Sequence, residues 1–179
     1  PDVVYNLASQ SFVPTSWKQP LFTGDVNALG PLRILEAVRL VSPETKVYQA
    51  SSSEMFGIST RKTQNEETPF APCSPYGASK LFAHNLVSCF RREYGIFAVG
   101  GILFNHESER RGKAFVTRKI AKSVAEIKAG TRQFIELGNL NACRDWGFAG
   151  DYVEGMWLMM QHSSPEDWVL ATGESITVK

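Results

Sequence analysis

A tyrosine and a lysine four residues apart, Tyr76 and Lys80, are the side chains in this sequence best suited to chemistry. Residues at this spacing lie on one face of a helix, so the ammonium can lie beside the phenol. A neighbouring cation favours the tyrosinate form, which can act as a base near neutral pH. Ser52 can supply a hydroxyl that orients an alcohol substrate. The set fits hydride transfer between an alcohol and a nicotinamide, although the same spacing also occurs by chance in helices.

Predicted strands and helices alternate along the chain. These elements would position Ser52, Tyr76 and Lys80. Apolar or alternating runs predict strands at residues 2–8, 46–50, 96–104 and 134–137. Helical spacing predicts helices after a cap at Thr23, after a cap at Ser74, and at about 114–129 and 150–161. Pro31 predicts a kink or a late start in the first of these helices. The alternation indicates an α/β fold with a doubly wound parallel sheet.

Polar residues follow three of the expected strands. These segments are Asn6–Ser11, Ser51–Glu54 and Asn105–Glu107, and a polar loop at 59–73 follows the second. Ligands of open parallel sheets bind beyond the carboxyl ends of the strands, so the three segments are expected to converge on one site. Glu54 stands two residues after Ser52. In an extended stretch the two side chains would therefore project to the same side.

Composition excludes several classes of function. The 179 residues include 19 Lys+Arg and 18 Asp+Glu, a net charge of +1 that would not draw the chain to nucleic acid or to an anionic membrane. No apolar run is long enough to cross a bilayer. Three scattered cysteines favour a reducing compartment, and three scattered histidines predict no metal site. His84 and His162 are expected at the surface or in packing.

A local basic cluster is the exception to this neutral charge. It runs from Arg110 to Lys122 and includes Arg111 and Lys119. Guanidinium groups suit the geometry of phosphate, so the cluster fits a nucleotide diphosphate. A nucleic-acid interface is disfavoured because the cluster is short and lies beside acidic residues. Some of its members, such as Lys113 and Lys122, are expected on a solvated helix face.

The sequence resembles the extended short-chain dehydrogenase/reductase superfamily that acts on nucleotide sugars, and within it the GDP-mannose 4,6-dehydratase family. The blocks that carry the resemblance are YNLASQSFV (5–13), RILEAVR (33–39), YQASSSEMFG (48–57), SPYGASK (74–80), GILFNHESERRG (101–112), FVTRKI (115–120), LGNLNACRDWGFAGDYV (137–153) and ATGE (171–174). They cover nearly the whole chain, and the blocks around residues 101–112 and 137–153 are more specific than the tyrosine–lysine pair alone.

The resemblance implies a role for individual residues. Ser52, Glu54, Tyr76 and Lys80 would be catalytic, and the cofactor NADP would contact Leu7, Ala8, Ser9, Gln10, Ser11, Tyr76, Lys80, His106 and Arg111. The substrate GDP-mannose would contact Asn105, Lys119 and Arg144. Phe12 and Phe22 replace a histidine and a tyrosine that are common in relatives, so the polar contacts of those positions are not expected here.

Glu54 decides which reaction is expected. Oxidation of the hexose at C4 acidifies the C5 proton, which a carboxylate can remove while the C6 hydroxyl leaves as water. Together with the resemblance, this chemistry implies a cytoplasmic 4,6-dehydratase that converts GDP-mannose to GDP-4-keto-6-deoxymannose, active as a homodimer or homotetramer. The alternatives are a nucleotide-sugar 4-epimerase or reductase of the same superfamily, or a non-catalytic NADP-binding scaffold.

The domain organisation expected from the resemblance is that of an internal fragment. Residues 1–105 would form the central and C-terminal part of an NADP-binding Rossmann domain whose N-terminal part is missing. Residues 106–179 would combine part of a smaller substrate-binding domain with returning Rossmann elements. No glycine-rich phosphate-binding turn such as GxGxxG occurs in the chain. The 179 residues alone are therefore expected neither to bind NADP tightly nor to turn over substrate.

Overall fold

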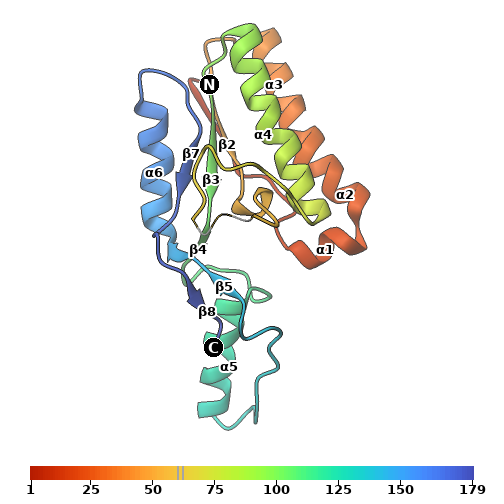
Figure 1. The fold of residues 1–179 in the computed structure, drawn as a ribbon, viewed down its shortest axis with the longest axis vertical. Helices are drawn as coiled ribbons and strands as arrows, with labels where there is room; N and C mark the ends of the chain where they lie inside the picture. Colours follow the sequence, from red (N-terminus) through yellow and green to blue (C-terminus); the bar gives the residue numbers. More distant parts are fainter. Residues whose placement is uncertain (60, 62) are drawn as a thin grey trace. The chain divides into compact units, whose positions relative to one another are not determined.

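A computed structural model describes residues 1–59, 61 and 63–179, so positions 60 and 62 of the expected polar loop lie outside the described residues. The chain forms two compact units, which we describe separately (Figure 1). The first comprises residues 1–104 and 153–170, and the second comprises residues 105–152 and 171–179.

The first unit is built on a four-stranded parallel sheet. Its strand order is β1 (Val3–Asn6), β2 (Lys46–Ala50), β3 (Ala98–Leu103) and β7 (Trp168–Leu170). The first three strands were predicted, and the bounds of β2 agree with the prediction at both ends. Strand β7 was not predicted, because its three residues are too few to show a period. It pairs with β3 through only three residues, and its partner strand is uniformly buried.

Helices cover both faces of this sheet, as the doubly wound fold requires. Side chains alternate along a strand, so Gly100 and Gly101 of β3 mark opposite faces. A Cβ on Gly100 would meet His84 of α4 (Pro75–Tyr94), whereas a Cβ on Gly101 would meet Tyr48. On the Tyr48 face, the Lys46 Nζ donates a hydrogen bond of 3.1 Å to the Met160 carbonyl of α6 (Ala149–Gln161). Figure 1 shows α6 across the sheet from α4.

The core between the sheet and its first helices is apolar. Helix α3 (Gly30–Val41) packs beside α4, and the buried cluster beneath them consists of Leu35, Val38, Val47, Val87, Phe90, Ile96 and Ala98. Burying such side chains stabilises the fold by roughly 1.5–3 kcal/mol each. This core anchors both the strand and the helix that carry the expected catalytic residues.

The helical segment before β2 is interrupted, as Pro31 predicted. Helices α1 (Val13–Lys18) and α2 (Pro20–Gly24) lead into a π-helical turn at Asp25–Leu29, after which α3 begins. Proline has no N–H and crowds the preceding turn, and the wider turn relieves that conflict. The expected cap at Thr23 is wrong. Thr23 lies inside α2, where its Oγ1 donates to the Gln19 carbonyl at 2.9 Å.

Helix α4 begins and ends where the sequence predicted. Ser74 is its N-cap, with the Oγ accepting a 3.0 Å hydrogen bond from the Gly77 amide, and Pro75 follows at the first helical position. Gly95 closes the helix in the left-handed conformation with φ of 67°. Both signals are local, which is why the sequence predicted them well.

The second unit contains a helix and two small sheets. Strand β4 (Asn105–Glu107) is parallel to β6 (Trp146–Phe148), and β5 (Cys143–Arg144) is antiparallel to β8 (Ile176–Thr177). Helix α5 (Val116–Lys128) confirms the helix expected at 114–129 to within two residues. The strand expected at 134–137 is wrong, because these residues are irregular and no strand of the described chain pairs with them.

A buried carboxylate organises the end of this second unit. Asp145 accepts hydrogen bonds from the Thr172 amide at 3.0 Å and from the Gly173 amide at 2.8 Å. These two bonds hold the turn that precedes β8. Among the residues that the structure describes, no helix has the length and apolar character needed to cross a bilayer.

Candidate active site

The carboxyl end of β2 leads directly into a tight turn that carries two of the expected catalytic residues. Ser52 is extended, with φ of −153° and ψ of 143°, and a single 3₁₀ turn at Ser53–Met55 follows it. The Ser52 Oγ caps this turn by accepting the Glu54 amide at 3.2 Å. The expected extended stretch from Ser52 to Glu54 is therefore wrong, because the serine hydroxyl bends the chain instead.

This cap leaves the Ser52 hydroxyl able to bind a ligand. One of its two lone pairs accepts from the Glu54 amide, and the hydroxyl proton stays available for donation. Ser52 is thus suited to donating a hydrogen bond to a substrate oxygen. Because Ser52 also holds the amide of Glu54, it links the positions of the two residues.

The turn is anchored from below and from the side. Met55 and Phe56 are buried in an apolar cluster with Ile102 of β3. From the side, the first turn of α4 approaches so closely that a Cβ on Gly77 would lie 2.6 Å from the Glu54 carbonyl oxygen. The half-buried Glu54 therefore lies on backbone that is held tightly against α4.

Tyr76 and Lys80 lie on successive turns of α4, and both are buried. The Lys80 Nζ is 5.8 Å from the centre of the Tyr76 ring, as the four-residue spacing predicted. The same Nζ donates a 2.9 Å hydrogen bond to the Ala50 carbonyl at the end of β2. Burial lowers the pKa of Lys80 to about 8, so the ammonium form still prevails at neutral pH. The lysine thereby joins the tyrosine helix to the serine strand.

The ends of β1 and β2 are also joined. Asn6 and Gln49 are opposite each other in the sheet, and the Asn6 Nδ2 donates to the Gln49 Oε1 at 2.7 Å. Both side chains are buried. The loop from Leu7 to Ser11 follows Asn6 directly, so the structure brings the first two of the three expected polar segments to one edge of the sheet.

A buried asparagine that the sequence reasoning missed holds this loop in place. The Asn27 Oδ1 accepts from the Gln10 amide at 2.8 Å and from the Ser9 Oγ at 3.1 Å, while its Nδ2 donates to the Gln10 carbonyl at 3.0 Å. Asn27 lies in the π-helical turn. An amide side chain within an apolar helical pattern, four residues before a proline, was the available signal.

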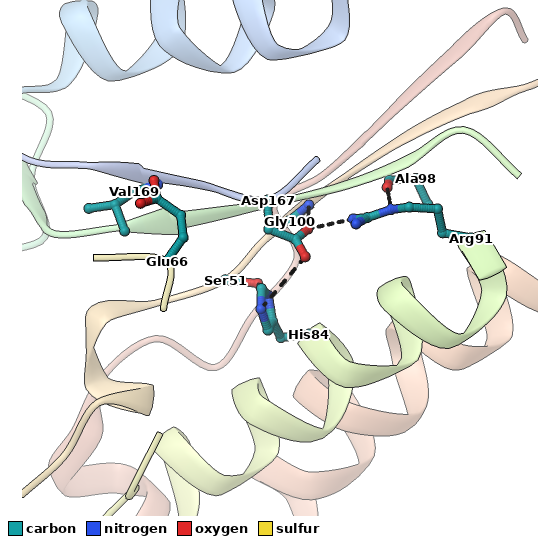
Figure 2. A network of polar contacts seen from close by, with 8 residues as sticks. All are labelled: Ser51, Glu66, His84, Arg91, Ala98, Gly100, Asp167 and Val169. Atoms are coloured by element: carbon teal, nitrogen blue, oxygen red, sulfur yellow. Dashed lines mark hydrogen bonds and ion pairs between the residues drawn. The ribbon is translucent and has the colours of Figure 1, made fainter. Parts of the chain in front are cut away.

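A second group of polar residues, drawn in Figure 2, surrounds the buried His84. The His84 Nδ1 is 2.9 Å from the Ser51 Oγ, and its Nε2 is 3.9 Å from the Asp167 Oδ2. Asp167 also accepts from Arg91 at 2.6 Å and from the Gly100 amide at 2.7 Å. The expectation of a surface or packing role for His84 missed these contacts, because Asp167 is 83 positions away in sequence.

The remaining expected site residues, which lie in the second unit, are described by their own surroundings. The His106 ring stacks on Tyr152 with ring centres 4.9 Å apart, and burial raises the pKa of Tyr152 to about 12. The Arg111 guanidinium lies 3.7 Å from the centre of the Phe115 ring and pairs with Glu107 at 3.1 Å. Asn105 begins β4, Lys119 lies in α5, and the exposed Arg144 lies in β5.

No cluster of three or more histidine, cysteine, aspartate or glutamate side chains suited to a metal ion occurs within residues 1–59, 61 and 63–179. The first unit brings together the side chains expected to act as an acid/base set. It combines a hydroxyl donor, a carboxylate, a phenol and a buried amine at the edge of one parallel sheet.

Comparison with known proteins adds to this geometry. All of residues 1–179 match the family described as GDP-mannose 4,6 dehydratase. The chain is 57% identical over 183 residues to GDP-mannose 4,6 dehydratase 1 of Arabidopsis thaliana, covering 100% of this chain and 50% of that protein. It is 53% identical over 181 residues to the human GDP-mannose 4,6 dehydratase, covering 100% of this chain and 49% of that protein. The chain thus spans about half the length of the curated relatives it matches.

Solved structures show the same fold. The structure of RMD from Pseudomonas aeruginosa complexed with NADPH has a TM-score of 0.94 and 25% identity, with 99% of this chain and 62% of that chain covered. The structure of DesIV, a dTDP-glucose 4,6-dehydratase from Streptomyces venezuelae, has a TM-score of 0.88 and 21% identity, with 98% of this chain and 53% of that chain covered. The Rossmann-type α/β fold expected from the sequence is confirmed.

Proposed function

The chain belongs to the GDP-mannose 4,6-dehydratase family, and from this membership we propose that its first unit carries the acid/base residues that convert GDP-mannose to GDP-4-keto-6-deoxymannose. The observation that carries the proposal is that α4, which carries Tyr76 and Lys80, is attached to the turn after β2, which carries Ser52 and Glu54. Lys80 holds the Ala50 carbonyl at 2.9 Å, and Gly77 abuts the Glu54 carbonyl. The helix that carries Tyr76 and Lys80 is thereby held against the segment that carries Ser52 and Glu54.

The first chemical task is removal of the proton from the C4 hydroxyl. Tyr76 takes this proton as tyrosinate, and the ammonium of Lys80 on the next turn stabilises that form. Ser52 donates its hydroxyl proton to the same substrate oxygen while one of its lone pairs accepts from the Glu54 amide. The two side chains together orient the alcohol for oxidation.

The second task is loss of water between C5 and C6. The C4 ketone acidifies the C5 proton, Glu54 removes that proton, and the carboxyl group then protonates the departing C6 hydroxyl. The bond between C6 and its oxygen breaks, and one water leaves. At the end of the cycle, C5 regains a proton from Tyr76, which had taken one from the C4 hydroxyl. Tyr76 is then a tyrosinate and Glu54 a carboxylate, as at the start.

The residues present fit a nicotinamide cofactor. Lys80 has three N–H donors, of which one is engaged by Ala50, so others can bind the hydroxyls of a nicotinamide ribose. The loop from Leu7 to Ser11 is fixed by Asn27 beyond the end of β1, where open parallel sheets bind ligands. When bound, NADP would supply the hydride acceptor for oxidation at C4 and the hydride donor for reduction at C6, so it would not be consumed.

The remaining assignments of the site and of the whole protein are part of the same proposal. His106 and Arg111 would contribute to NADP binding, and Asn105, Lys119 and Arg144 to binding of GDP-mannose. Residues 1–105 would belong to the NADP-binding domain, and residues 106–179 to the mixed substrate-binding segment. We also propose a homodimer or homotetramer in the cytoplasm. All three cysteines are exposed and free, which supports a reducing compartment.

Mass spectrometry of the reaction product tests the proposal. The full-length gene product, incubated with GDP-mannose and NADP, is expected to release a nucleotide sugar that is lighter by one water. In deuterium oxide the product is expected to carry deuterium at C5, because the C5 proton is removed and replaced. A product of unchanged mass would support the 4-epimerase alternative and contradict the dehydratase.

Two variants separate the dehydratase from a non-catalytic scaffold. Glu54→Gln and Tyr76→Phe are each expected to lower the rate of water loss by about 10²–10⁴-fold, the usual contribution of a positioned acid or base. Glu67→Gln is the matched control, because Glu67 is an exposed carboxylate in the loop that follows the site. If the wild type releases no water and both site variants leave the protein's function intact in every assay, the scaffold alternative holds.

A further inference from the structure

Two side chains of α4 hold two consecutive residues of the chain immediately before Ser52. The Lys80 Nζ donates to the Ala50 carbonyl at 2.9 Å, and the His84 Nδ1 lies 2.9 Å from the Ser51 Oγ. Lys80 and His84 are one helical turn apart on the same face. The path of the backbone into Ser52 is therefore fixed at two successive points by the helix that also carries Tyr76.

The buried His84 ring also has neighbours from other segments of the first unit. Its other nitrogen faces Asp167 at 3.9 Å, and the edge of Phe70 packs against the ring with centres 5.3 Å apart. A Cβ on Gly100 would lie 2.8 Å from the His84 Nδ1, so the backbone of β3 closes the space beside it. Rotation of the imidazole would therefore disturb its contacts with Ser51, Asp167 and Phe70.

The charges around the ring favour one protonation state. Burial lowers the pKa of His84, Arg91 acts in the same direction, and Asp167 opposes both. The Asp167 carboxylate is already paired with Arg91 at 2.6 Å, so its charge is partly neutralised. In the neutral ring, the nitrogen that faces Asp167 is the better place for the proton. The Nδ1 then accepts a hydrogen bond from the Ser51 hydroxyl.

We propose that His84 is a positioning residue for catalysis, which fixes Ser52 and the turn that carries Glu54 against Tyr76 by holding the Ser51 hydroxyl. This inference rests on the proposed dehydratase function. His84 contacts Ser51, the residue before Ser52, and does not act on the substrate itself. Small displacements of catalytic groups cost large factors in rate, so a residue in this place acts on kcat and leaves substrate binding nearly unchanged.

The test uses the full-length gene product with three variants. His84→Phe keeps the ring shape and removes the acceptor, Ser51→Ala removes the hydroxyl, and His84→Asn places an amide oxygen near the position of the Nδ1. We expect His84→Phe and Ser51→Ala each to lower kcat by about 10–100-fold with the KM for GDP-mannose changed by less than about threefold, and His84→Asn to recover most of the loss. His162→Phe, at an exposed histidine, is the matched control.

Two further measurements separate positioning from stability. The double variant Ser51→Ala/His84→Phe is expected to be no slower than the worse single variant, because both remove the same contact. With GDP-mannose deuterated at C4, the isotope effect on kcat is expected to rise in His84→Phe, since hydride transfer becomes slower than the other steps. A merely structural role would lower the melting temperature and the active fraction but leave this isotope effect unchanged.

The outcomes distinguish this inference from the function on which it rests. If the wild-type protein releases no water from GDP-mannose, the proposed function fails before His84 is tested. If the wild type does release water and His84→Phe or Ser51→Ala keeps its kcat, the positioning role is overturned. Should His84→Phe fail to fold, Ser51→Ala decides the question, because it removes one oxygen atom from the end of a strand.

Discussion

The Gly77 Cα faces the Glu54 carbonyl so closely that a methyl group on it would lie 2.6 Å from that oxygen and 3.1 Å from the Pro72 Cβ. This contact joins the helix of the tyrosine to the turn of the carboxylate. Both neighbours are parts of the backbone or of a rigid ring, so neither can move aside easily. Any side chain at residue 77 must push the Glu54 turn away from Tyr76.

Gly77→Ala is therefore expected to lower both stability and activity. Forcing a methyl group into a closed contact costs typically about 1–3 kcal/mol, and we expect at least a tenfold loss of kcat as Glu54 shifts. Gly24→Ala is the control, since Gly24 is helical and a methyl group on it would have no neighbouring atom within 4 Å. That change is expected to stabilise by about 0.5–1 kcal/mol. Denaturant unfolding and steady-state rates measure both, and equal behaviour of the two variants would contradict the close contact.

Lys80→Met is expected to stabilise the protein while abolishing its activity. Burial lowers the pKa of Lys80 to about 8. Below that pH the buried side chain is a charged ammonium, which lowers the stability of the folded state. The Ala50 carbonyl retains a hydrogen bond from the Gln49 Nε2 at 3.0 Å when the lysine is removed. We expect a gain on the order of 2 kcal/mol at pH 7.

The gain should depend on pH in a defined direction. Between pH 8 and the ordinary lysine pKa near 10.5, the unfolded wild-type chain binds a proton that the folded chain has released. Wild-type stability therefore rises with pH in this window through Lys80, and the advantage of Lys80→Met shrinks. Denaturant midpoints at pH 7 and pH 10 measure this. An advantage that grows with pH would refute the buried charge.

Asn27→Ala is expected to weaken NADP binding because it releases the loop after β1. The change removes the acceptor of the Gln10 amide and the donor to the Gln10 carbonyl, which lie at 2.8 Å and 3.0 Å from the asparagine. We expect at least a tenfold rise in the Kd for NADP, measured by calorimetry on the full-length protein, with a stability loss of about 1–3 kcal/mol. Ser9→Ala removes one contact of the same asparagine and should have a smaller effect.

Ser52→Thr and Ser52→Ala separate the two roles of this hydroxyl. Threonine keeps the group that caps the turn and donates to the substrate, so most of the activity is expected to remain. Alanine loses both, with a predicted stability loss of about 1 kcal/mol from the missing cap and a kcat loss of about 10²-fold. Equal activity of the alanine variant and the wild type would show that Ser52 has no part in the reaction.

Sequence reasoning worked best where one short segment contained the whole signal. The start of α4 follows from Ser74 and Pro75, and its end from Gly95, because each acts on the residues next to it. The proximity of Tyr76 and Lys80 followed from their four-residue spacing on a helix. Strand β2 followed from a short alternating run in front of three serines.

The features that sequence reasoning missed depend on residues far apart in the chain. The partners of His84 come from positions 51 and 167, and no local pattern links them. Strand β7 has three residues and exists because β3 offers it a buried edge. The turn at Ser53–Met55 was predicted as extended, because spacing cannot show that the Ser52 hydroxyl would accept the Glu54 amide. The role of Asn27 was hidden for the same reason.

The carboxylate of Glu66 has a consequence for how the sheet can grow. β7 is the outermost strand on its side of the four-stranded sheet, and the Val169 amide on that strand donates to the Glu66 Oε1 at 2.8 Å (Figure 2). An outer strand with free amides is a template for another chain, and a charged group at that position opposes such pairing. Glu66 thus occupies an amide that another strand would need for pairing with β7, and its charge opposes the addition of a strand on this side.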